Sequence, residues 1–460
     1  MAKSTVPTPG LSVFGSLRAE DEPWLHACFT PPPEFEHIIA PRSTIIFGGP
    51  GSGKTTLYQR VRAHSLCDGK PYRLLVDWQP APLNAGEQAT IAWVKNQAVH
   101  LFDHCVVALS ECLARWPELY TAAPAWAQAR LAWFIQQYLQ GDPKIRLGPL
   151  LENTQSGSDL LTQLFSVPAP IILYPDASPE QVIAELTTAL SVTGLGGIWV
   201  LSDGLEDWSS VDAPSFLRGL GAFLSTLPLF EKAGLVYKLW APLAFEPELS
   251  RAGGLARRRV DSVRLQWTPD ELRRLAERRI ALALNEPTFD LTHLSQDEDF
   301  LPWLEKVGGD APRAWLDQLG PLVKYFAAHG QKSLETKTWL RLRREYPPKL
   351  YLSEDGYRVL VGGRDIDLEE LPAKSYEMLH YLYQHAGTVI SKADLYYRCY
   401  LGLERTPRTG EDLHYVSPKD YEGLIDTSLW RLRRAIEPDP SKPVLLVSKR
   451  GRGVVLNVRW

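Results

Sequence analysis

The residues with the clearest chemical purpose form a glycine-rich loop that ends in lysine and threonine. Its glycines let the backbone turn N–H groups toward phosphate oxygens, and the helix that follows adds the positive end of its dipole. Lys54 is spaced to reach the β and γ phosphates, and Thr55 to offer its hydroxyl to Mg²⁺. The loop therefore predicts a site for ATP and Mg²⁺. Its expected contacts are Gly48, Gly49, Pro50, Gly51, Ser52, Gly53, Lys54, Thr55 and Thr56.

A second group of candidate residues is acidic and follows the apolar run 197–201. A carboxylate at the end of a buried strand beside a phosphate loop is a ligand for the magnesium ion, and Asp203 takes that role. Glu206 or Asp207 would polarise the attacking water, because hydrolysis needs a proton acceptor near the γ-phosphate. The alternative is that these two carboxylates only complement the dipole of a helix N-terminus.

These groups need a sheet to position them. Short apolar runs predict strands at 43–47, 72–76, 197–201, 235–240 and 263–265, with a further candidate at 171–174. Apolar residues recur at helical spacing between Ala92 and Leu139, which predicts a helical insertion of unassigned function. Alternation of strands and helices is typical of a parallel α/β domain.

Length and composition bound the class of protein. A chain of 460 residues suggests about three domains, and 45% hydrophobic residues are enough to build cores. The first ten residues have no apolar targeting segment, and no run of about 18 apolar residues follows, so we expect a cytoplasmic protein without a membrane span. The five cysteines form no metal-binding spacing and predict free thiols. A net charge of −4 argues neither for nor against nucleic acid.

After Leu265 the pattern becomes helical, beginning with a capping box from Thr268 to Glu271. The run Asp203-Gly204-Leu205-Glu206-Asp207 resembles the acidic box of STAND-class signalling ATPases, relatives of the AAA+ family, and the resemblance covers about 14–339. It implies a slow regulatory ATPase with a helical lid after the sheet. Gly309-Asp310-Ala311-Pro312-Arg313-Ala314 is similar to the sensor 2 motif of origin-recognition AAA+ initiators. By that resemblance Arg313 reaches the γ-phosphate.

Two further roles rest on the same resemblance. Lys238 lies on the strand that carries a polar sensor in these families, although a lysine there can also be a strand-edge residue. Arg251 and the run 257–259 lie where AAA+ proteins carry an arginine finger for a neighbouring subunit, which implies a homo-oligomer formed through the ATPase domains. The alternative is a solvated basic turn.

From Pro348 onward the sequence pattern differs from that of the preceding helical region. Alternating apolar residues and tight turns predict a small meander, and three helical segments follow. The third has apolar residues at Ile425, Leu429, Leu432 and Ile436, and two valine-rich strands then flank a basic hairpin tip. Strands, three helices and a basic hairpin predict a winged helix-turn-helix.

The details resemble the OmpR/PhoB-type transcriptional regulatory domain over about 350–458. Ala386 to Leu395 is similar to its turn between the first two helices, and Leu429 to Pro440 to its recognition helix and exit. In that family the third helix enters the major groove of double-stranded DNA and the wing approaches the minor groove. The resemblance places on DNA the residues Thr427, Ser428, Arg431, Arg434, Lys449, Arg450 and Arg452.

Three departures keep a second interpretation open. The link 401–418 is longer than usual, Val454 and Val455 replace an aromatic and a basic residue, and 348–460 holds 17 Lys and Arg against 16 Asp and Glu. Strong DNA binding needs clustered positive charge, which exists here only locally. The alternative is a STAND-like sensor whose winged helix contacts protein, with a protein trigger.

The predicted fold class is α/β: a P-loop NTPase parallel sheet with a helical lid, followed by an α+β winged helix-turn-helix domain. The predicted boundaries are 1–42 for an N-terminal segment, 43–265 for the ATPase domain with its insertion near 84–165, 266–345 for the lid and 348–460 for the winged helix. We expect an ATP-operated DNA-binding switch whose outlet is transcription, replication, transposition or defence.

Overall fold

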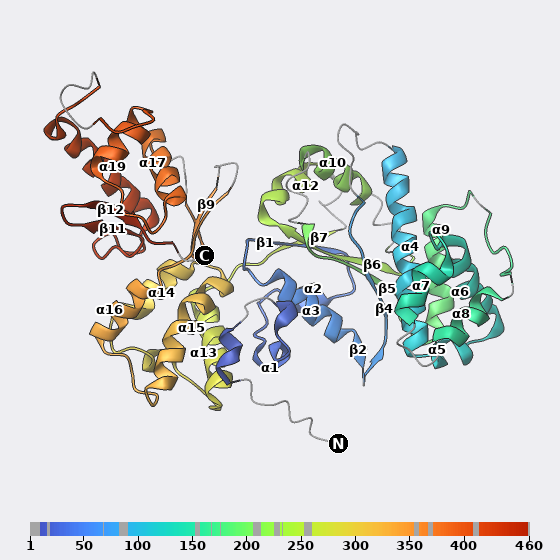
Figure 1. Ribbon diagram of the computed structural model, residues 1–460. Helices are drawn as coiled ribbons and strands as arrows, with labels where there is room; N and C mark the ends of the chain where they lie inside the picture. The colour runs from blue at the N-terminus through green and yellow to red at the C-terminus, as the bar shows by residue number, and fades with distance from the viewer. Residues whose placement is uncertain are drawn as a thin grey trace. The chain divides into compact units, whose positions relative to one another are not determined.

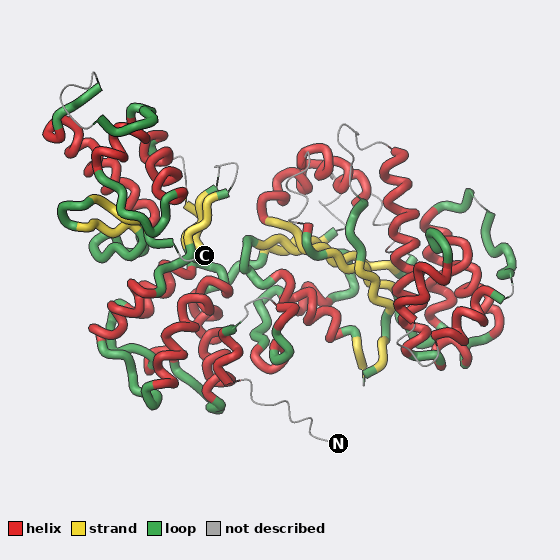
Figure 2. Tube along the Cα trace, in the orientation of Figure 1, coloured by secondary structure: helices red, strands yellow, loops and turns green. Residues whose placement is uncertain are grey.

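The computed structural model describes residues 10–15, 19–67, 69–81, 91–151, 157–166, 168–174, 176–205, 213–224, 231, 233–252, 260–353, 358–366, 371–407 and 414–458 (Figure 2). The chain forms two compact units. One comprises Pro31–Gly49 and Lys54–Leu265, and the other comprises Met1–Thr30, Pro50–Gly53 and Gln266–Trp460.

The first unit is built on a five-stranded parallel sheet in the order β4-β5-β6-β1-β7. The strands are β1 (Thr44–Gly48), β4 (Leu74–Asp77), β5 (Ile198–Ser202), β6 (Leu235–Pro242) and β7 (Asp261–Arg264). Five of the predicted strands are therefore confirmed. Strand β6 separates β1 from β5, so the loop after β1 and the acidic residue after β5 belong to strands that are not neighbours.

Helices cover both faces of this sheet (Figure 1). On one face lie α2 (Phe35–Ile39) and α3 (Lys54–His64), and on the other α10 (Ala213–Leu224) and α12 (Glu246–Ala252), the last following the short η4 (Leu243–Phe245). The central strands β1 and β5 are buried along their whole length, as expected of parallel strands between two helical layers. A two-stranded hairpin, β2 (Leu66–Cys67) with β3 (Lys70–Pro71), precedes β4.

The predicted helical insertion is confirmed between β4 and β5. It consists of α4 (Ile91–Arg115), α5 (Glu118–Thr121), α6 (Ala125–Tyr138), α7 (Pro143–Leu151) and α8 (Gly157–Phe165), followed by α9 (Pro179–Ser191). Leu101, Leu131 and Leu186 are buried in a core that continues into the sheet. The candidate strand at 171–174 was wrong: these residues lie in a loop, where Ile171 and Tyr174 are both exposed.

The second unit begins with η1 (Gly10–Phe14), η2 (Ala19–Asp21) and α1 (Leu25–Cys28), which pack against a helical layer. That layer contains α13 (Pro269–Leu284), η5 (Leu291–His293), α14 (Phe300–Gly308), α15 (Pro312–Ala328) and α16 (Thr336–Glu345). The capping box of Thr268 and Glu271 forms as predicted. A buried ion pair between Glu22 and Arg279 ties the amino-terminal segment to α13, and burial raises the pKa of Glu22 against the opposing effect of Arg279.

The carboxyl-terminal region of this unit starts with an antiparallel sheet in the order β10-β9-β8. Its elements are β8 (Leu350–Leu352), β9 (Val359–Val361), β10 (Arg364–Ile366), α17 (Ala373–Gln384), α18 (Lys392–Asp394), the π-helix η6 (Leu395–Tyr400), α19 (Pro418–Ile436), β11 (Leu446–Lys449) and β12 (Gly453–Leu456). The predicted stripe Ile425, Leu429, Leu432 and Ile436 is buried in one core with α17 and β12. The Ser391 side chain accepts the backbone amide of Asp394 and caps α18.

Among the described helices, none combines the length and the apolar character needed to cross a membrane.

Candidate functional site

The phosphate loop, Gly48–Thr55, leaves the carboxyl end of β1 and enters α3. Gly51 and Gly53 have φ values of 75° and 97°, in the left-handed region that favours glycine. The Lys54 ammonium donates to the carbonyl oxygens of Gly48 at 3.1 Å and Gly49 at 3.2 Å. Lys54 is only 7% exposed, so its charge is held inside its own loop. A bound phosphate would offer a better partner than two neutral carbonyl groups.

Ser52, at the apex of the loop, is also buried. Its hydroxyl oxygen has no hydrogen-bond partner within the part of the chain that the structure describes. A buried hydroxyl without a partner is costly, and a phosphate oxygen would satisfy it. The Trp267 indole donates to the Ser52 carbonyl oxygen at 2.9 Å, so the loop backbone is anchored from the segment that precedes α13. The donor set fits a nucleotide phosphate.

Asp203 follows β5, where the sequence places it. Gln79, just beyond β4, donates from its side-chain amide to the Asp203 carbonyl oxygen at 3.2 Å and holds the turn. Glu206 and Asp207 lie outside the described residues. Across the described ranges, no group of three or more His, Cys, Asp and Glu could hold a metal ion. Thr55 and Asp203 carry oxygen donors of the kind that magnesium takes, and magnesium needs only one or two protein oxygens because phosphate and water complete its shell.

A polar cluster that the sequence did not reveal ties α3 to the sheet. The Tyr58 hydroxyl donates to Asp77 Oδ1 at 2.5 Å, and Arg62 forms an ion pair with the same carboxylate. Burial and the Asp77 carboxylate raise the pKa of Tyr58. Because α3 carries Lys54 at its first turn, this cluster fixes the helix that presents the lysine.

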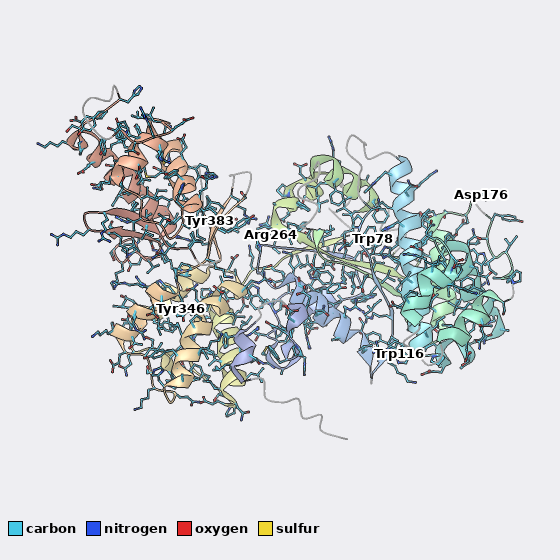
Figure 3. The ribbon with its side chains drawn as sticks, viewed as in Figure 1. Trp78, Trp116, Asp176, Arg264, Tyr346 and Tyr383 are labelled. Carbon is cyan, nitrogen blue, oxygen red and sulfur yellow. The ribbon has the colours of Figure 1, made fainter. Side chains whose placement is uncertain are left out.

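Arg313 begins α15 and is exposed. Its backbone amide donates to the Gly51 carbonyl oxygen at 3.2 Å. A Cβ on Gly51 would lie 2.9 Å from the Arg313 Cβ, so only glycine allows this approach. A cavity of about 630 Å³ opens beside this contact. Its wall includes Pro50, Lys324, Lys349 and Tyr346, the last labelled in Figure 3.

The proposed sensor role of Lys238 was wrong. Lys238 pairs with Thr44 at the start of β1, whereas the phosphate loop leaves the other end, where Gly48 pairs with Pro242. The Lys238 ammonium is fully buried and donates to the Ala40 and Arg42 carbonyl oxygens and to the Thr44 hydroxyl, at 2.8, 2.7 and 3.0 Å. The side chain therefore fixes the amino-terminal end of β1. Residues 257–259 lie outside the described residues, and the side chain of Arg251 is not described.

Helix α19 presents Thr427, Arg431 and Arg434 on its exposed side, away from the buried stripe. Ser428 was predicted on this face and is instead buried, because it lies three residues after Ile425 and four before Leu432. That spacing was readable from the sequence. Ser428 had been placed on DNA by the resemblance to the OmpR/PhoB-type domain.

The β11–β12 hairpin carries Lys449, Arg450 and Arg452 at its exposed tip. Its base is fixed because Ile390 and Val454 exchange backbone hydrogen bonds of 2.8 and 2.9 Å. Glu437, after α19, is buried and accepts the amides of Val444, Leu445 and Leu446 at 2.9, 2.9 and 2.6 Å. Burial raises the pKa of this carboxyl. These bonds fix the hairpin relative to α19.

The β9–β10 turn contacts the end of α14 through four glycines, Gly308 and Gly309 against Gly362 and Gly363, here called the glycine contact. The Gly363 amide donates to the Val307 carbonyl oxygen at 3.0 Å. A Cβ on Gly363 would lie 1.9 Å from the Gly308 carbonyl oxygen. The double glycine was predicted only as a turn, and no signal in the sequence indicated its partner.

Further contacts hold α14 and α16 to the connection between α19 and β11. Lys442 pairs with Asp299 at 3.0 Å. The buried Arg343 guanidinium donates to the Lys442 carbonyl oxygen at 2.7 Å and lies 3.6 Å from Asp439. The carboxyl-terminal region is therefore docked on the helical layer at two places.

Comparison with known proteins adds three solved structures, and no family model matches the chain. The chain is similar to the Aeropyrum pernix ORC1 protein in complex with DNA, with 16% identity over 98% of this chain and 94% of that chain and a TM-score of 0.32. It is similar to the ORC2 protein of the same organism with ADPNP and ADP, at 13% identity, 94% and 92% coverage and a TM-score of 0.35. The ADP form of ORC2 gives 13% identity, 96% and 91% coverage and a TM-score of 0.32. Because these scores are low, the function proposed below rests on the residues and contacts already described.

Proposed function

We propose that this protein is an ATP-dependent molecular switch that binds double-stranded DNA through a carboxyl-terminal winged helix. The observation that carries the proposal is the position of α15. Its first residues contact Gly51 of the phosphate loop, and the segment just before it forms the glycine contact with the β9–β10 turn. A change at the phosphate loop thus has a short physical path to the carboxyl-terminal region.

The nucleotide half of the proposal is supported by the loop and the sheet order. A glycine-rich loop after a central parallel strand, with a carboxylate after a strand two positions away, suits binding and slow hydrolysis of Mg²⁺-ATP. Lys54 would neutralise the β and γ phosphates, Thr55 and Asp203 would hold Mg²⁺, and Glu206 or Asp207 would orient water. Arg313 would reach the γ-phosphate from α15.

The DNA half is supported by the exposed cations of α19 and the hairpin tip. Arg431, Arg434 and Arg450 are exposed, so each side chain is accessible to a phosphate. By analogy with the OmpR/PhoB-type domain, α19 would enter the major groove and the hairpin would approach the minor groove. The process controlled by the switch would be transcription, replication, transposition or defence.

The test is a filter-binding titration of a DNA duplex over a salt series, with ATP, with ADP and without nucleotide. Phosphate contacts predict a steep loss of affinity as salt rises. Replacing Arg431, Arg434 and Arg450 with alanine should weaken binding and flatten the salt slope by up to about 3. A matched control replaces Lys144, Lys306 and Lys332 with alanine, three exposed lysines elsewhere in the chain. It should leave both quantities near those of the parent.

If the parent binds no duplex in any nucleotide state, the DNA half of the proposal fails. The alternative is then a STAND-like signalling ATPase whose carboxyl-terminal region contacts a protein partner. If the duplex binds equally with ATP, with ADP and without nucleotide, the switch fails while DNA binding stands.

A further inference from the structure

The exposed face of α19 carries a large apolar side chain that the structure does not use for packing. Trp430 is 55% exposed. With Gly423, Thr427 and Arg434 it lies opposite the buried stripe of the helix, because residues three, four and seven apart share one face. An exposed indole at the centre of a helical face offers a partner apolar contact area with a polar N–H group.

The indole is held in place by a neighbouring cation. The Arg434 guanidinium lies over the Trp430 ring at 4.9 Å from its centroid, one helical turn away. The stack limits the rotamers of both side chains, so less freedom is lost when a partner binds. The stacked pair presents an apolar ring face beside a positive charge. A DNA phosphate interacts favourably only with the charge.

Gly423 supplies an independent observation on the same face. It lies inside α19, where glycine costs about 1 kcal/mol relative to alanine. No described heavy atom lies within 4 Å of the position that its Cβ would take, so packing within the chain does not require glycine. A bare backbone on an exposed face allows a partner to approach the helix closely.

The charges around this face favour a DNA groove over an apolar protein surface. Arg431 and Arg434 supply positive charge in the carboxyl-terminal half of α19. Of the three carboxylates of α19, Asp426 is paired with Lys392 at 2.7 Å, and Asp420 and Glu422 lie in the amino-terminal half of the helix. The arginines of α19 therefore place positive charge in the second half of the helix, where Trp430 lies.

In the major groove, the one apolar group on a base edge is the thymine methyl, which apolar side chains contact in direct readout. We infer that Trp430 determines sequence specificity by contacting a thymine methyl group in the major groove, with Gly423 allowing α19 to lie close to the bases. This inference rests on the proposed DNA-binding function. The contact between Trp430 and the thymine methyl group would distinguish a preferred site from other duplexes.

The experiment starts from a random duplex library, from which the full-length parent protein enriches preferred sites. Deoxyuridine then replaces each thymine of such a site in turn, which removes only the methyl group. The parent should lose roughly four-fold in affinity at one or two thymines, the effect of one buried methyl. Trp430→Ala should bind the thymine and deoxyuridine duplexes equally, while its salt slope stays within about 1 of the parent because no phosphate contact is removed.

Trp126 provides a matched control. It is 44% exposed on α6, and Arg130 lies over its ring at the same 4.9 Å, one turn away. Trp126→Ala should keep the parental discrimination. Gly423→Ala should keep or raise the unfolding midpoint and weaken binding of the selected site.

Each outcome tests either the role of Trp430 or the DNA-binding function on which that role rests. Duplex binding by the parent without discrimination between thymine and deoxyuridine at any position overturns the role of Trp430 and leaves the proposed function intact. Discrimination that survives in Trp430→Ala overturns the role of Trp430 as well. A parent that binds no duplex overturns the proposed function and this inference together.

Discussion

The backbone amide of Gly363 donates a 3.0 Å hydrogen bond to the carbonyl oxygen of Val307, and this bond lies at the centre of the glycine contact. Four residues after Val307, Ala311 precedes the helix whose Arg313 amide is bonded to Gly51. The Trp315 indole donates to the Gly309 carbonyl oxygen at 3.1 Å and fixes the same segment from the other side. The segment 307–313 is therefore hydrogen-bonded at both ends: Val307 to Gly363 in the β9–β10 turn, and Arg313 to Gly51 in the phosphate loop. A shift at one end must be accommodated at the other.

Replacing Gly363 with alanine tests this contact. Its Cβ would lie 1.9 Å from the Gly308 carbonyl oxygen and 2.8 Å from the Ala311 Cβ, and both neighbours are rigid. We expect a loss of about 1–3 kcal/mol in unfolding free energy, as for other overpacked sites. We also expect ATP to lose its effect on duplex affinity. Denaturant unfolding and nucleotide-dependent filter binding measure the two effects.

Gly148→Ala is the control for that substitution. Gly148 lies in α7, and no described heavy atom lies within 4 Å of the position of its Cβ. This variant should match the parent in both measurements. A Gly363→Ala protein with parental stability and a parental response to ATP would show that the glycine contact transmits nothing.

The Lys54 ammonium lies over the Gly48 and Gly49 carbonyl groups, in the loop that is proposed to hold ATP. Lys54→Ala should weaken ATP binding roughly 30-fold or more, because a buried charged partner of the phosphates is lost. Isothermal calorimetry measures the affinity. Lys144→Ala, which removes an exposed lysine of α7, serves as the control. ATP affinity that is unchanged in Lys54→Ala would remove the phosphate loop from the nucleotide site.

We expect the acidic residues after Asp203 to be needed for ATP hydrolysis and not for ATP binding. Glu206→Gln with Asp207→Asn removes both candidate acceptors of the water proton and keeps their shape. We expect ATP affinity within about three-fold of the parent and turnover lowered by 10²-fold or more, the usual range for loss of general base catalysis. Steady-state phosphate release measures turnover. Normal turnover in this double variant would place the activating group elsewhere in the chain.

The parts of this fold that could be predicted from the sequence are those fixed by local chemistry. The phosphate loop, the capping box of Thr268 and the buried stripe of α19 each depend on residues a few positions apart. The position of β6 between β1 and β5 depends on pairing across most of the first unit and leaves no local signal. The same holds for Gln79, which contacts Asp203 more than a hundred residues away. Lys238 was misread for this reason, since the oxygens that accept its hydrogen bonds belong to Ala40, Arg42 and Thr44, at and just before the start of β1.

The pH dependence of stability tests Lys238. Burial, and to a lesser extent the charge of Arg73, lower the pKa of this lysine to about 7 against the opposing effect of Asp261 and Glu231. The unfolded chain keeps an ordinary lysine pKa of about 10.4, so between pH 7 and pH 10 the unfolded state binds more protons than the folded state. Stability due to this group therefore rises with pH in that window, by up to about 1.4 kcal/mol per pH unit. Below pH 7 both states are charged, and the full cost of burying the ammonium is present.

Lys238→Met removes the titrating group and keeps most of its volume. The variant should be less stable than the parent near pH 7, because the Ala40 and Arg42 carbonyl groups and the Thr44 hydroxyl lose their donor. The decisive quantity is the difference between parent and variant in unfolding free energy, measured in urea at several pH values between 6.5 and 9.5. That difference should grow in favour of the parent as pH rises, since other titrating groups cancel in the comparison. Lys337→Met, at an exposed lysine of α16, should give a difference that does not change with pH. If the Lys238→Met difference is equally flat, the three hydrogen bonds keep the buried ammonium charged throughout, and its pKa lies near that of an exposed lysine.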